Sequence, residues 1–149
     1  MSVTTFVAGD IIRTMDPEFE MEYKPLDATS PPAVGICGVL DAGGDLVIAD
    51  GTAAQTKQIG VRTSFVDPES SNVGVLKRGY IVQEAGGDLD VDEYVKPNAA
   101  GKPVQADPGL ATDEEVTYGV VVGKANQSDQ ATRVNASSGE LVIIKVGDY

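Results

Sequence analysis

The sequence GYIV at residues 79–82 is followed by AGGDL (85–89), YVKPNAAGKPV (94–104) and VTYGVVV (116–122). In this stretch, short runs of β-branched and aromatic residues alternate with Gly, Asn and Asp, the residues that tight hairpin turns favour. The pattern predicts consecutive antiparallel strands. No combination of residues within it points to catalysis.

Strands are expected on both sides of this stretch, at residues 33–40, 46–49, 60–66, 73–76 and 141–146. Residues 77–79 (Lys-Arg-Gly) are expected to turn the chain, and a helix is expected only between Asp107 and Glu115. The last strand is apolar without interruption, which indicates burial on both of its faces. The sequence therefore predicts an all-β fold, a small antiparallel β-barrel or sandwich with little helix.

The composition limits the possible partners. The 149 residues carry 23 acidic and 11 basic side chains, giving a formal charge of −12. So acidic a surface repels phosphates, and direct binding to nucleic acid is not expected. No apolar run approaches the roughly 20 residues that cross a bilayer, so no membrane partner is expected either. The Asp-rich acidity suits a high-salt host, although mesophilic proteins can be equally acidic.

The start of the chain and its one cysteine suggest where the protein is made. Met1–Thr5 lacks the basic start of a secretion signal, so we expect synthesis in the host cytoplasm. Cys37 stands alone in an apolar run and is expected to be a buried core residue.

The residues that usually carry chemistry are missing from the sequence. It contains no His, the commonest general base near neutral pH, and its one Cys excludes a zinc site built on thiolates. Neither an enzyme nor a cofactor is expected. Asp88, Asp90 and Asp92 resemble the opening of a calcium-binding loop, but Glu93 stands where that loop requires Gly. We interpret the three Asp as solvated residues of a strand edge and keep a cation site as the alternative.

The first 32 residues differ from the rest, and we expect them to form an extended N-terminal arm and a Pro-rich connector before a β-domain at residues 33–149. Within residues 15–23, apolar and acidic residues alternate with a period of two. Such a segment either lies along the sheet of a neighbouring protein or forms a first or edge strand of its own domain. Pro17 disfavours a helix here.

Four segments carry a resemblance to a known family: LKRGYI (76–81), DEYVKPNAAGKPV (92–104), YGVVVG (118–123) and GELVIIKV (139–146). Together they resemble the small capsid decoration, or cement, proteins of tailed double-stranded DNA viruses, with a β-domain like that of the lambda head-decoration protein. The resemblance covers roughly residues 73–146. The acidic surface and the long polar loop at residues 125–138 depart from many relatives.

The resemblance implies a compact β-barrel-like domain that forms a homotrimer on the outer surface of the virion. There it would bind the major capsid protein at three-fold or quasi-three-fold positions and stabilise the shell. In that family an N-terminal arm often joins the coat lattice. The apolar residues of the arm are therefore the candidate capsid-binding residues: Phe6, Ile11, Ile12, Phe19, Met21 and Tyr23.

Two other functions stay open at the sequence level. One is another β-module of the virion, such as a tail tube, fibre-base or spike component. The other is a small β-domain that binds a carbohydrate or an ion.

Overall fold

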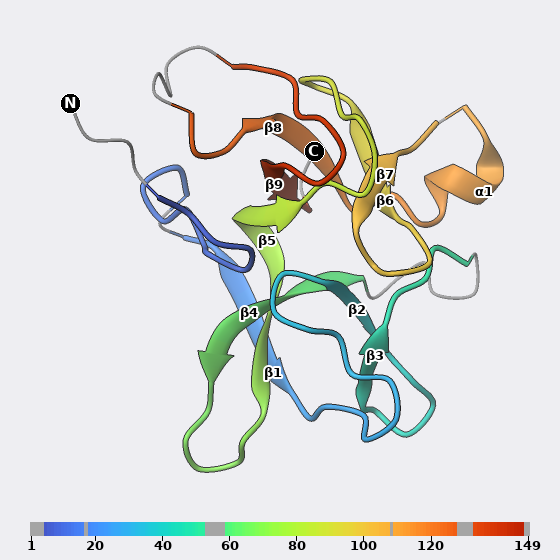
Figure 1. Cartoon of the computed structure of the whole chain (residues 1–149). Helices are drawn as coiled ribbons and strands as arrows, with labels where there is room; N and C mark the ends of the chain where they lie inside the picture. Colours follow the sequence, from blue (N-terminus) through green and yellow to red (C-terminus); the bar gives the residue numbers. More distant parts are fainter. Residues whose placement is uncertain (1–4, 17, 53–58, 108, 128–132, 148–149) are drawn as a thin grey trace.

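The computed structural model describes residues 5–16, 18–52, 59–107, 109–127 and 133–147. Within these ranges the fold is all-β, as the sequence predicts: one antiparallel sheet of nine strands curls into a half-barrel (Figure 1). The elements are β1 (Glu20–Lys24), β2 (Cys37–Leu40), β3 (Leu46–Ile48), β4 (Gly60–Val66), β5 (Val73–Glu84), β6 (Tyr94–Pro97), β7 (Pro103–Gln105), α1 (Ala111–Glu114), β8 (Gly119–Lys124) and β9 (Leu141–Val146). No helix within the described ranges has the length and apolar character that crossing a membrane requires.

The long strand β5 lies at the centre of the sheet. Its first half pairs with β1 and with β4, and its second half pairs with β9. An isolated bridge between Ile11 and Ile81 adds the N-terminal residues to the second half. The strand order β3-β2-β4-β5-β9-β8-β6-β7 therefore continues through β5, with β1 attached to it as a branch.

The predicted turn at residues 77–79 is wrong. β5 passes through these residues without a break, and Gly79 lies in register opposite Val146. Gly79 has φ 137°, a conformation that glycine adopts without the steric cost of a Cβ atom. The chain therefore continues through this glycine as one strand and does not reverse there.

Several other local predictions agree with the structure. β2 and β3 form a hairpin about residues 41–45, and β6 and β7 form one about residues 98–102. β4 and β9 match the predicted strands residue for residue, and α1 falls within the predicted window. The predicted strand at residues 33–40 is shorter, because β2 begins at Cys37. Part of the predicted loop at 125–138, residues 128–132, lies outside the described residues.

The core confirms that β9 is buried on both faces. Val142, Ile144 and Val146 point into the main apolar cluster. Ile143 belongs to a smaller cluster on the opposite face of the sheet, together with Ile12. The apolar side chains on this second face must be covered by residues outside the sheet. The N-terminal residues provide part of that cover.

A buried polar network crosses the main core. The Tyr118 hydroxyl donates a hydrogen bond to Gln83 Oε1 at 2.6 Å, and Gln83 Nε2 donates to the Gly35 carbonyl at 2.9 Å. Gln83 Nε2 also lies 3.6 Å from Cys37 Sγ. Burial raises the pKa of the Cys37 thiol to about 12 and raises the pKa of Tyr118 well above its usual value. Both groups are therefore protonated at neutral pH, so the network carries no charge.

Replacing Tyr118 with Phe should lower the free energy of unfolding by roughly 1–3 kcal/mol, because Gln83 Oε1 then loses its donor in a site without solvent. Chemical denaturation at pH 7 measures the change. Tyr80→Phe is the matched control, since the half-buried Tyr80 makes no side-chain hydrogen bond to the described part of the chain. Equal stability of the two variants would show that the network contributes nothing.

Candidate functional site

The N-terminal segment lies along β5. β1 pairs with β5 from Glu20 opposite Arg78 to Lys24 opposite Val73. Further toward the N-terminus, Gly9 N–H donates to the Val82 carbonyl at 2.8 Å, and two more backbone bonds join residues 10–12 to β5. Of the two partners that the alternation left open, this structure pairs the segment with the sheet of its own chain. The division into an arm (1–32) and a domain (33–149) stays a prediction.

Two glycines of β5 give this segment the room to pack closely. A Cβ atom at Gly74 would lie 2.6 Å from Met21 Sδ, and one at Gly79 would lie 2.8 Å from Phe19 Cβ. Real side chains essentially never approach so closely, so larger residues at these positions would push Met21 or Phe19 away from β5. The surface of β5 is therefore shaped to accept these two side chains.

The structure divides the six candidate capsid-binding residues among three environments. Phe6 and Ile12 pack in the small cluster on the outer face of the sheet. Ile11 and Phe19 pack against the main core, and the half-buried Met21 lies above Gly74. Tyr23 is 43% exposed. The six residues thus do not form one continuous surface in this conformation, and their role in capsid binding stays a prediction.

A groove of about 600 Å³ opens between residues 6–15 and the strands β8 and β9. Its apolar lining includes Phe6, Ile12, Met15, Val122 and Ile143. It continues the small outer cluster, because Phe6, Ile12 and Ile143 belong to both. The groove therefore exposes the part of this apolar face that the N-terminal segment leaves uncovered.

Three basic residues also line the groove: Arg13, Lys124 and Arg133. Lys124 Nζ lies 2.5 Å from Glu140 Oε2, and Arg133 forms two hydrogen bonds to Asp92, at 2.8 and 3.1 Å. The hydrogen bond from Lys124 lowers the pKa of Glu140. The sequence did not predict Lys124 and Arg133 as site residues. They lie far from the arm in sequence, and no local pattern indicates that they come close to it.

Arg13 is held differently from the other two basic residues. Its guanidinium carbon lies 5.6 Å from the ring centroid of Phe19 and 5.2 Å from that of Phe65. Cation–π attraction at these distances stabilises the charge without neutralising it. Arg13 forms no ion pair with a carboxylate in the described part of the chain.

The residues of the alternative cation site, Asp88, Asp90 and Asp92, do not share one set of contacts. Asp88 accepts a hydrogen bond from the Ser138 N–H at 3.0 Å, and Asp92 pairs with Arg133. All three carboxylates are exposed, whereas Leu89 between them is fully buried. The segment is a turn with one bridge, from Leu89 to Ala136, rather than the expected strand.

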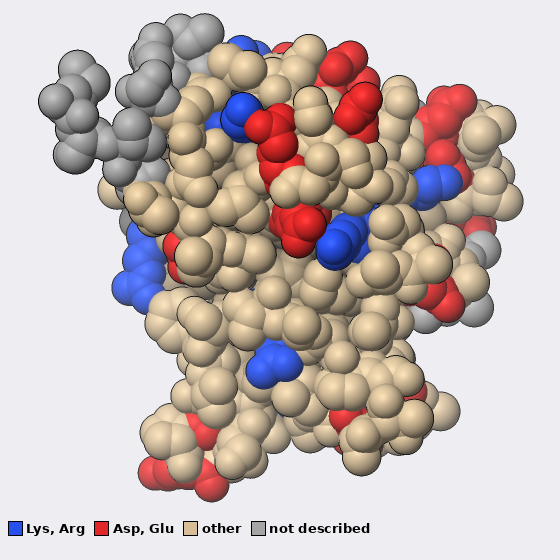
Figure 2. All heavy atoms as spheres, viewed as in Figure 1, with Lys and Arg blue, Asp and Glu red and all other residues tan. Residues whose placement is uncertain are grey.

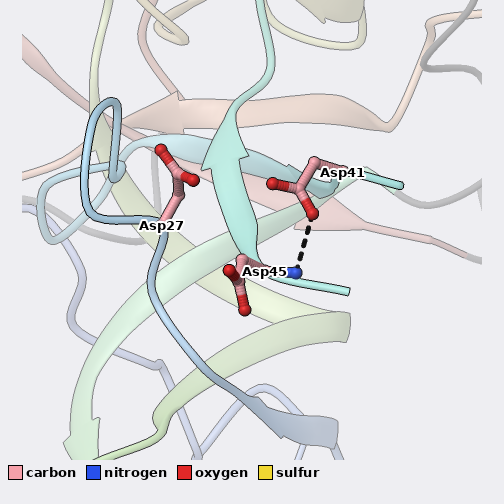
Figure 3. Close-up of side chains that lie close together, drawn as sticks. All are labelled: Asp27, Asp41 and Asp45. Carbon is pink, nitrogen blue, oxygen red and sulfur yellow. Dashed lines mark hydrogen bonds between the residues drawn. The ribbon is translucent and has the colours of Figure 1, made fainter. Parts of the chain in front are cut away.

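A different group of three carboxylates lies close together: Asp27, Asp41 and Asp45, whose oxygens fall within 4.8 Å of one another (Figure 3). The parallel bridge between Leu26 and Leu46 brings them together from separate parts of the chain. Asp41 Oδ1 accepts hydrogen bonds from the Gly43 and Asp45 N–H groups, at 2.9 and 3.0 Å. Asp27 accepts two such bonds from residues 29 and 30. Turn formation therefore explains the positions of Asp27 and Asp41 without a bound cation. Calcium needs at least six oxygen ligands, which is more than one oxygen from each of these three carboxylates.

The remaining acidic side chains are spread over the surface. On the face in Figure 2 they form several separate groups, most of them in the upper part of the view, with basic side chains between them. On this face the negative charge is thus divided among several groups and does not mark one site. No protein-family model matches the chain, and no curated protein matches it significantly.

Replacing Gly74 with Ala should displace Met21 and loosen β1, because the added methyl group would overlap the Met21 sulfur. Overpacking of this kind costs roughly 1–3 kcal/mol. Hydrogen exchange should show faster exchange at the amides of Met21–Lys24. Gly87→Ala is the matched control, since a Cβ there meets its nearest neighbour at 3.7 Å. Unchanged exchange in β1 of the Gly74→Ala variant would contradict a fitted contact.

Proposed function

We propose that the protein is a structural virion protein that binds the outer surface of a capsid and stabilises the shell. It acts as a homotrimer at three-fold or quasi-three-fold positions, with the major capsid protein as its partner. The observation that carries the proposal is the N-terminal segment: an extended chain of alternating apolar and acidic residues that lies along β5. The resemblance of residues 73–146 to cement proteins supports it, and the all-β half-barrel agrees with the fold that this resemblance implies.

The docked state of the segment suits a protein that must stay soluble before it meets a capsid. Ile11, Ile12 and Phe19 are covered by the chain's own sheet. The exposed Tyr23 stands at the end of the segment nearest the connector and is available for first contact. The high negative charge also keeps free copies apart in solution.

Three-fold assembly would make weak contacts sufficient. When one arm of a trimer has bound, the other two arms are held near their sites, and their binding is effectively intramolecular. If the decoration protein binds the assembled shell but not the separate coat subunits, its binding stabilises the shell by mass action. Neither effect needs covalent chemistry.

Electron microscopy of virus particles that contain the protein tests the proposal. Density for it should lie outside the shell at the three-fold or quasi-three-fold positions. Copurification with tails would instead identify a tail or fibre component. Absence from both heads and tails would overturn a role in the virion.

A surface variant tests the part played by the arm. Tyr23→Ser should weaken binding to isolated shells in a sedimentation assay, and a tenfold loss per arm becomes up to roughly 1,000-fold when three arms engage together. Leu110→Ser is the matched control: Leu110 is 53% exposed and stands at the N-cap of α1, where Ser is well tolerated. Equal binding of the two variants would show that Tyr23 does not take part in the contact with the capsid.

A further inference from the structure

The groove between the N-terminal segment and strands β8 and β9 has the size and lining of a small-molecule site. Its volume of about 600 Å³ lies within the usual range of ligand pockets, roughly 300–1,000 Å³. Phe6, Ile12, Val122 and Ile143 give it an apolar wall. Ile12 and Ile143 are themselves buried in the outer cluster, so the wall is anchored in the fold.

The described residues that line the groove include cations but no carboxylate, although two of the cations are paired with carboxylates beside it. Of the twelve described residues that line it, three are basic and none is acidic. Over the whole chain, acidic residues outnumber basic ones by 23 to 11. Arg13 has no ion pair in the described part of the chain, and Lys124 and Arg133 can bind an anion where it replaces Glu140 or Asp92 as their partner. Together with the apolar wall, these cations favour a ligand with a negative charge and an apolar body.

The basic side chains can turn to a ligand at little cost. In the Lys124–Glu140 pair each side chain is 35% exposed, and in the Arg133–Asp92 pair the two are 52% and 66% exposed. Ion pairs as open to water as these contribute little to stability, so a bound anion can compete with the carboxylate.

We propose that this groove binds a small organic anion with an aliphatic tail, of the alkyl carboxylate class. The tail lies against Phe6, Ile12, Val122 and Ile143, and the carboxylate accepts hydrogen bonds from Lys124 and Arg133. This inference is independent of the proposed role on the capsid. It would hold for the free protein in solution.

A charge-matched pair of probes tests the site on the full chain. Isothermal titration with dodecanoate, below the concentration at which it forms micelles, should give saturable binding of one molecule per chain. Dodecyltrimethylammonium, with the same tail and the opposite charge, should bind at least about tenfold more weakly, because it cannot accept the charge-assisted hydrogen bonds that the carboxylate accepts. Equal binding of the two probes, or no binding of dodecanoate, would overturn the proposal.

Two variants of one ion pair should move the affinity in opposite directions. Lys124→Gln removes a cation from the rim and should weaken dodecanoate binding about tenfold. Glu140→Gln removes the carboxylate that competes for Lys124, so it should strengthen binding. The Gln side chain can still accept the hydrogen bond that Glu140 Oε1 now receives from Ser137 N–H. If the Lys124–Glu140 pair only stabilised the fold, both substitutions would change the affinity in the same direction. That result would contradict the assignment.

A third variant blocks the apolar wall. Val122→Glu places a charge in the groove and should abolish binding, whereas Val66→Glu, on β4 and 52% exposed, should leave it unchanged. Near-ultraviolet circular dichroism establishes that each variant is folded. If Val122→Glu does not fold, the opposite shifts of the Lys124 and Glu140 variants still decide the matter. Retained binding in a folded Val122→Glu variant would place the ligand elsewhere.

Discussion

The pairing of β5 along its whole length is the constraint on which the rest of the structure depends. The strands that precede it in sequence, β1 and β4, pair with its first half, and β9, which follows it, pairs with its second half. At about 3.3 Å per residue, twelve residues are long enough to serve two sets of partners. The two halves of the chain therefore join into one sheet through a single shared strand. A change that breaks β5 would remove the one strand that both halves share.

The buried polar network adds a second connection between the same halves. Gln83 belongs to β5, and its side chain bonds to Gly35 in the first half of the chain and to Tyr118 in the second. Each hydrogen bond contributes little by itself, but an unpaired group in this core would be costly. The network thus favours one arrangement of the two halves over others that would bury similar apolar area.

The outer face of the sheet explains why the N-terminal segment and the groove belong together. β8 and β9 carry apolar side chains on this face as well as in the core, among them Val122 and Ile143. Phe6 and Ile12 cover part of the face, and the groove is the part left open. The position of the segment therefore sets the shape of the groove. Release of the segment on a capsid would remove one wall of the groove.

Local patterns in the sequence were sufficient to predict the strand type, most of the hairpins and the two buried faces of β9. The turn expected at residues 77–79 failed because Gly79 and the two charged residues before it are typical of turns, whereas here the glycine makes room for Phe19. An alternation with a period of two fixes which residues share a face, but it does not identify the strand beside them. The pairing of β1 with β5 therefore could not be deduced.

The candidate site was predictable only in part, for the same reason. Phe6, Ile11 and Ile12 were singled out as apolar residues of the arm, and all three line the groove. Lys124 and Arg133 reach it through contacts between residues far apart in sequence. The acidic group of Asp27, Asp41 and Asp45 likewise depends on the bridge between Leu26 and Leu46. The spacing of these residues in the sequence indicates neither the position of the two basic residues at the groove nor the acidic group.

Native-state hydrogen exchange along β5 tests most directly whether this strand makes the two halves one cooperative unit. The amides of Val75 and Leu76 in the first half, and of Ile81 and Gln83 in the second, should open with free energies equal within about 0.5 kcal/mol and close to that of global unfolding. If the first pair opened at an energy lower by about 2 kcal/mol or more while the second stayed protected, the halves would unfold separately. That result would contradict the central place given to β5.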